Sequence, residues 1–109
     1  MKVAVIGSRD IYIPNIGIYL PGDCTEIVSG GARGVDRCAE SYAKDAGLKL
    51  KLFLPDYDSF GRKAPLIRNR EIVDYADCVI AFWNGTSNGT RYVINYCRQV
   101  GKPCTVIYV

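Results

Sequence analysis

Histidine is absent from the 109-residue chain, and methionine and tryptophan each occur only once. The lack of histidine excludes catalytic triads, histidine-based general acid–base chemistry and the commonest ligand of protein-bound metals. The five cysteines form no C-x-x-C pair, and four of them lie in apolar segments. We therefore expect free thiols, no metal site and a reducing, cytoplasmic location.

Long apolar runs and runs of like charge are also missing. No segment approaches the roughly 20 apolar residues of a membrane-spanning helix. The apolar start of the chain ends at Gly7, which is too early for a signal peptide. Fourteen basic and 11 acidic residues leave a net charge of +3 without a basic cluster. These observations favour neither a membrane nor a nucleic-acid partner.

What the chain does contain is an alternation of short apolar runs and amphipathic segments. Strands are predicted over residues 2–6, 25–28, 49–54, 78–82 and 104–109, with 49–54 at a sheet edge. Helices are predicted over 35–46, 65–76 and 90–100, with a short or distorted helix from Pro14, a turn at 21–23 and a loop at 55–61. This order predicts a single α/β, Rossmann-like domain over residues 1–109, with a five-stranded parallel sheet and helices on both faces.

A glycine-rich run joins the second predicted strand to the first long helix. It reads Ser29-Gly30-Gly31-Ala32-Arg33-Gly34-Val35-Asp36. Backbone N–H groups at a helix start bind anions, glycine lets a phosphate approach, and Arg33 adds a positive charge. The alternative is a tight turn that needs glycine only for its dihedral angles. Asp36 either bonds a ribose hydroxyl or holds the turn through backbone N–H groups, and we favour the structural role.

Two further small polar loops follow the first and fourth predicted strands. The carboxyl ends of parallel strands share one edge of the sheet, where ligands bind in such folds. In the first loop, Arg9 either contacts a phosphate or pairs with Asp10. In the second, the glycines form another anion-binding turn, with Ser87 and Thr90 as hydroxyl donors. The candidate ligand-binding residues of these loops are Gly7, Ser8, Arg9, Trp83, Asn84, Gly85, Ser87, Gly89 and Thr90.

Three larger side chains complete the candidate site. Trp83 either stacks on a base or caps the core. Asn69 lies on an apolar helix face, so its amide needs a partner, either a ligand or the backbone of a neighbouring loop. Arg68 faces the ligand or is an ordinary exposed helix arginine.

The glycine-bearing loops and the Arg68-Asn69 pair resemble, in order and spacing, the SLOG superfamily and its small YspA-like members. The resemblance covers essentially the whole chain. It implies a Rossmann-like fold and a relationship to three groups of proteins. These are nucleotide-sensing domains, the DNA-processing protein that binds single strands, and the LOG phosphoribohydrolases that act on N6-substituted adenine ribotides.

The resemblance to the hydrolases includes one departure. Arg68 matches the arginine that they use near the glycosidic bond, but Val93 stands where they carry a glutamate. The remaining candidate carboxylates are Asp36 and Glu71. We therefore expect a nucleotide-derived ligand, bound without turnover and without a required cofactor. The alternatives are an N-glycosidic hydrolase and a single-stranded DNA-binding module. Tyr92 and Tyr96 lie off the apolar stripe of the last helix and leave a homodimer open.

Overall fold

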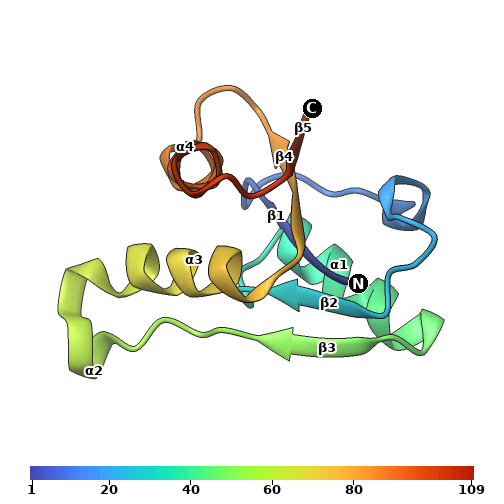
Figure 1. The fold of residues 1–109 in the computed structure, drawn as a ribbon, viewed down its shortest axis with the longest axis horizontal. Helices are drawn as coiled ribbons and strands as arrows, with labels where there is room; N and C mark the ends of the chain where they lie inside the picture. The colour runs from blue at the N-terminus through green and yellow to red at the C-terminus, as the bar shows by residue number, and fades with distance from the viewer.

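Five parallel strands form one sheet in the order β3-β2-β1-β4-β5 (Figure 1). The structure, a computed structural model, describes residues 1–109. The strands are β1 (Lys2–Gly7), β2 (Glu26–Ser29), β3 (Lys49–Leu52), β4 (Cys78–Trp83) and β5 (Cys104–Tyr108). Every neighbouring pair is parallel. The predicted fold class is therefore confirmed, with strand ends that differ by one or two residues.

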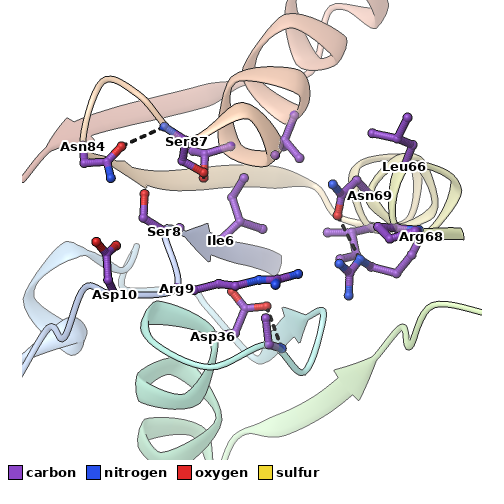
Figure 2. A pocket seen from close by; sticks show the side chains of 17 residues that line it. Ile6, Ser8, Arg9, Asp10, Asp36, Leu66, Arg68, Asn69, Asn84 and Ser87 are labelled. Carbon is purple, nitrogen blue, oxygen red and sulfur yellow. Dashed lines mark hydrogen bonds between the residues drawn. The ribbon is translucent and has the colours of Figure 1, made fainter. Parts of the chain in front are cut away.

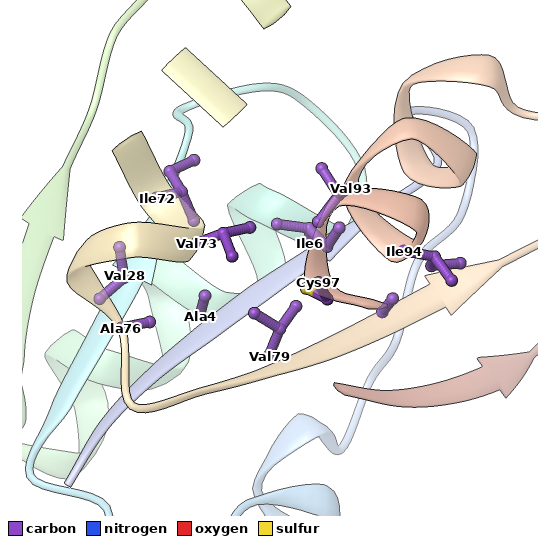
Figure 3. Packing of buried hydrophobic residues seen from close by; sticks show 11 residues of the cluster. Ala4, Ile6, Val28, Ile72, Val73, Ala76, Val79, Val93, Ile94 and Cys97 are labelled. Atoms are coloured by element: carbon purple, nitrogen blue, oxygen red, sulfur yellow. The ribbon is translucent and has the colours of Figure 1, made fainter. Parts of the chain in front are cut away.

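Helices cover both faces of this sheet. Helices α3 (Ala64–Tyr75) and α4 (Asn88–Val100) pack Ile72, Val73, Val93 and Cys97 on one face, as Figure 3 shows. Helix α1 (Val35–Ala46) and the short 3-10 helix η1 (Ile16–Tyr19) pack on the other. Successive strand residues point to opposite faces, so both layers are built from one apolar run. In β1, Ala4 and Ile6 face α3 and α4, whereas Val3 and Val5 face α1.

Of two connecting segments, one agrees with the prediction and one differs. The short or distorted helix expected from Pro14 is the 3-10 helix η1, which begins at Ile16, and its Gly17 packs directly on the Tyr42 ring. The predicted loop 55–61 contains a short helix, α2 (Tyr57–Phe60), followed by the 3-10 turn η2 (Gly61–Lys63). The Asp56 side chain caps α2 by accepting a hydrogen bond from the Ser59 N–H at 3.1 Å.

The edge strand β3 and the cysteines agree with the prediction. Strand β3 forms one edge, and its residues are largely exposed, as the alternation of lysine and leucine predicts. All five cysteines are free. None of the helices is both long and apolar enough to cross a membrane.

The order of the strands creates a crevice beyond the carboxyl ends of β1 and β4. After β1 the chain moves outward to β2 and β3 and then returns to the other side of β1 as β4. Ligands in open parallel sheets bind at such a reversal. Gly34, at φ +77°, brings the start of α1 against the loop after β1, where an added Cβ would lie 2.4 Å from the Arg9 carbonyl oxygen. This close approach places Asp36 beside Ser8 and Arg9.

Candidate ligand-binding site

A cavity of about 360 Å³ lies in this crevice, between the loop after β1 and the starts of α3 and α4 (Figure 2). Its volume falls within the range of small-molecule sites. The structure brings ten of the predicted site residues together in its lining. They are Gly7, Ser8, Arg9, Asp36, Arg68, Asn69, Asn84, Ser87, Gly89 and Thr90.

The start of α4 forms the open anion-binding end of the cavity. The first turn of a helix leaves its N–H groups without intrahelical acceptors, and no loop carbonyl accepts from Gly89 or Thr90. The Asn84 carboxamide oxygen fixes the preceding loop by accepting from the N–H groups of Thr86 and Ser87, both at 2.9 Å. Space is open at Gly89, where an added Cβ would meet nothing within 4 Å. The helix start is therefore accessible to a phosphate.

Ser8 is a buried polar residue that lacks a partner for its hydroxyl. The residue is only 3% exposed, and its Oγ makes no hydrogen bond. Its backbone N–H donates to the Phe82 carbonyl at 3.3 Å, so the main chain is fixed while the side chain lines the cavity. Figure 2 shows this side chain pointing toward the loop of Asn84 and Ser87. A buried unpaired hydroxyl costs about 1–3 kcal/mol, which a polar ligand atom would recover.

Arg68 is buried rather than exposed, at 8%. Its Nη1 donates to the Gly30 carbonyl at 2.7 Å, and its Nε donates to the Asn69 side-chain oxygen at 2.9 Å. Burial lowers the pKa of the guanidinium, while the nearby carboxylate of Asp36 acts in the opposite direction. The amide of Asn69 therefore has a partner that the sequence analysis did not consider, namely the neighbouring arginine side chain.

Asp36 closes the glycine-rich turn between β2 and α1. Its Oδ2 accepts hydrogen bonds from the N–H of Gly30 at 3.2 Å and of Ala32 at 3.3 Å. The N–H of Gly31 donates to the Ser29 hydroxyl at 3.3 Å. The structural role predicted for Asp36 is thus confirmed. Burial raises the pKa of its carboxyl from 3.8 to about 6, against the lowering effect of the Ala32 N–H and Arg68.

The prediction of a phosphate across Gly30 and Gly31 does not fit this geometry, because both N–H groups already have acceptors. Glycine is needed at these two positions because neighbouring side chains pack closely against the backbone and because Gly31 has a positive φ angle. An added Cβ at Gly30 would lie 2.7 Å from Arg68 Nη1, and Gly31 combines φ +72° with a Leu54 methyl 2.7 Å from such a Cβ. The predicted residues of this run that do not line the cavity are Ser29, Gly30, Gly31, Arg33 and Gly34.

Trp83 also lies outside the cavity lining, so it does not offer a stacking surface there. Its Nε1 donates to the Ser87 carbonyl at 3.1 Å, and its ring centroid lies 5.7 Å from that of Tyr108. Trp83 therefore holds the 84–87 loop in place from outside the cavity. Gly85 likewise lies outside the lining, and so does Glu71, which is exposed.

The cavity has an apolar wall that was not predicted, formed by Pro65, Leu66 and Ile72 with Ile6 and Val93. A signal for part of it exists in the sequence. Residues 65, 68, 69 and 72 recur at helical spacing, so a face containing Arg68 and Asn69 also contains Pro65 and Ile72. Asp10, at the cavity mouth, and Ala32 were not predicted either.

Comparisons with known proteins identify one relative of limited coverage. No family model and no solved structure matches the chain. The chain is similar to the Gene 61 protein of Mycobacterium phage D29, at 36% identity over 83 residues. The match covers 71% of this chain and 66% of the phage protein, just under two thirds of that relative's length. The name of this relative states no activity.

Proposed function

We propose that this protein binds a nucleotide or nucleotide-derived small molecule in the cavity beyond β1 and β4, as a sensor or carrier without turnover. The observation that carries the proposal is the buried, unpartnered hydroxyl of Ser8 facing the open start of α4. A phosphate supplies the acceptors that this hydroxyl and the N–H groups of Gly89 and Thr90 lack. No cofactor is required for this function.

The two ends of the cavity suit the two ends of a nucleotide. The Arg9 side chain extends across the cavity past Asp36 and adds a positive charge to the lining (Figure 2). The apolar wall of Pro65, Leu66 and Ile72 offers a surface for a base. Arg68 and Asn69, on the same helix as this wall, also line the cavity and carry polar groups that can bond sugar hydroxyls.

Calorimetry with adenosine monophosphate and adenosine tests the proposal. We expect the monophosphate to bind and the nucleoside to bind much more weakly, because the nucleoside lacks the group that the α4 start would hold. Equal affinities would contradict the proposal. Gly89→Val should abolish binding without unfolding the chain, since the added side chain enters open space at the α4 start. Gly22→Val, also in open space but in a distant turn, is the matched control.

A second candidate is hydrolysis of the N-glycosidic bond of a nucleoside monophosphate. Asp36 favours it, because this carboxyl lines the cavity and burial raises its pKa to about 6. A carboxyl of that pKa suits general acid–base work near neutral pH. Two observations disfavour hydrolysis. Asp36 Oδ2 already accepts two hydrogen bonds from the N–H groups of the turn, and Val93 lines the cavity at the position where the hydrolases that the chain resembles carry a glutamate.

We further propose that the protein works in the cytoplasm and has no nucleic-acid partner. The homodimer suggested by Tyr92 and Tyr96 gains no support from their contacts. The Tyr92 hydroxyl accepts a bond from Arg70 at 2.6 Å, and the Tyr96 hydroxyl donates to Asp74 at 2.8 Å. Both tyrosines thus join α4 to α3 within one chain.

A further inference from the structure

All three consecutive N–H groups of the β2–α1 turn are already bonded within the chain. Asp36 Oδ2 accepts from Gly30 and Ala32, and the Ser29 hydroxyl accepts from Gly31. Ser29 in turn donates to the Glu40 carboxylate at 3.3 Å. Two carboxylates therefore support a turn whose sequence otherwise predicts phosphate binding.

This closed turn borders the same cavity as the open start of α4. Ala32 and Asp36 belong to the lining, as do Gly89 and Thr90 on the other side. Two loops lead into helices at this cavity. The loop before α4 leads to N–H groups that are available to an anion, whereas the N–H groups of Gly30, Gly31 and Ala32 before α1 are already bonded by the chain's own side chains.

The charges in the cavity also suit a ligand with a single phosphate. Its charged lining residues are Arg9 and Arg68 on one hand and Asp10 and Asp36 on the other, so their formal charges cancel. A single phosphate is matched by the α4 start and one arginine. A second phosphate placed against the β2–α1 turn would meet the Asp36 carboxylate, and the N–H groups of Gly30 and Ala32 that could bind it there are already bonded.

We propose that Asp36 is a specificity-determining residue that limits the ligand to one phosphate, because its carboxylate takes the place of a second one. The inference rests on the proposed function and names the ligand class more narrowly. Nucleoside monophosphates fit the site, whereas diphosphates, triphosphates and pyrophosphate-bridged ligands do not.

Amide chemical shifts in ¹⁵N-labelled protein, titrated with inorganic phosphate and inorganic pyrophosphate, test the inference. In the wild type, both anions should shift the Gly89 and Thr90 resonances and leave those of Gly30 and Ala32 in place. Pyrophosphate, despite its greater charge, should bind no more tightly than phosphate. Asp36→Ala frees two N–H groups and should raise the preference for pyrophosphate over phosphate about tenfold or more, because hydrogen bonds to charged groups are strong.

Two further variants separate charge from occupancy. Asp36→Asn removes the charge but retains an oxygen that can accept from Gly30 and Ala32, so its gain for pyrophosphate should be smaller than that of Asp36→Ala. Asp10→Ala removes a charge from the same cavity without touching the turn, so its gain for pyrophosphate measures the effect of charge alone and should be smaller than that of Asp36→Ala.

Two wild-type results would overturn the inference, whether or not any variant folds. One is a tenfold preference for pyrophosphate, and the other is a shift of the Gly30 and Ala32 resonances on binding. If neither anion shifts Gly89 or Thr90, the proposed function itself fails, and the inference fails with it.

Discussion

The guanidinium of Arg68 donates a hydrogen bond from Nη1 to the backbone carbonyl of Gly30, at 2.7 Å, across 38 positions of sequence. The N–H of the same Gly30 donates to the Asp36 carboxylate. The cavity's buried arginine and its buried acid are therefore positioned by one residue of the β2–α1 turn. This arrangement couples helix α3 to helix α1 through the turn, and it makes the turn a structural element of the site.

Replacing Arg68 tests this coupling. Arg68→Ala removes a charged donor from the Gly30 carbonyl and from the Asn69 amide, so we expect a loss of about 1.5–3 kcal/mol in the free energy of unfolding. Arg68→Lys should recover only part of it, because an ammonium lacks the planar fork that reaches both partners. Urea denaturation measures both variants. Arg62→Ala, in the exposed turn η2, is the control.

Replacing Ser8 should weaken ligand binding without lowering the stability of the protein. Ser8→Ala removes a buried hydroxyl that has no partner, so the free energy of unfolding should stay the same or rise by up to about 1 kcal/mol. Binding of adenosine monophosphate should nevertheless weaken about tenfold, since the ligand loses a donor. Thermal unfolding and calorimetry on the same samples check both effects, with Ser59→Ala in exposed α2 as the control. A parallel loss of stability and binding would mean that Ser8 is only structural.

The fold was predictable because local signals and the sheet architecture agree. The apolar run of β1 supplies both core layers, and only a central parallel strand needs such a run. Glycines at the carboxyl ends of β1, β2 and β4 correctly indicated the edge at which the cavity lies. The helical turn at Tyr57–Phe60 was missed, because its signal is a single Asp56 cap rather than an apolar repeat.

The details of the site were less predictable, because they depend on contacts between distant segments. Nothing local to Gly30 and Gly31 says whether their N–H groups face a ligand or Asp36. That outcome is decided by how Arg68, from α3, and Asp36, from α1, meet at the turn. Trp83 is a second example. A tryptophan at the end of a strand can stack on a ligand base or pack on a neighbouring side chain, and its sequence position does not distinguish the two; here the ring packs on Tyr108 of the neighbouring strand.

Asp36 should make stability depend on pH. Burial raises the pKa of its carboxyl from 3.8 to about 6, so the native chain holds this proton more tightly than the unfolded chain does. The associated stability is fully present below about pH 4 and is lost as the pH rises through 6, by on the order of 3 kcal/mol.

The Asp36→Asn variant separates the pH-dependent stability that comes from Asp36 from that of the other acidic residues. The free energy of unfolding of this variant should fall less than that of the wild type between pH 4 and pH 7. Asp10→Asn, at the cavity mouth, should follow the wild-type curve. Parallel curves for the wild type and Asp36→Asn would show that Asp36 does not titrate in this range.

Binding of single-stranded DNA should be no tighter than non-specific. A single-strand site needs a basic groove and stacking aromatics. The cavity lining contains no aromatic residue, and two aspartates offset its two arginines. We expect no complex tighter than about 10⁻⁴–10⁻⁶ M at physiological salt. A gel shift at nanomolar protein would contradict this expectation.

The last prediction concerns turnover of the bound ligand. Cleavage of an N-glycosidic bond passes through a cationic transition state that needs a carboxylate to stabilise it or to activate water. In this cavity Val93 is apolar and Glu71 lies outside, so Asp36 is the only one of the candidate carboxyls within reach. Its Oδ2 accepts from the N–H groups of Gly30 and Ala32, which fixes the carboxyl against the β2–α1 turn. We therefore expect no release of base from adenosine monophosphate or its N6-substituted forms, even after long incubation at high protein concentration, as measured by chromatography. Base release that disappears in both Arg68→Ala and Asp36→Asn, but persists in Glu71→Gln, would establish the hydrolase instead and identify Asp36 as its acid.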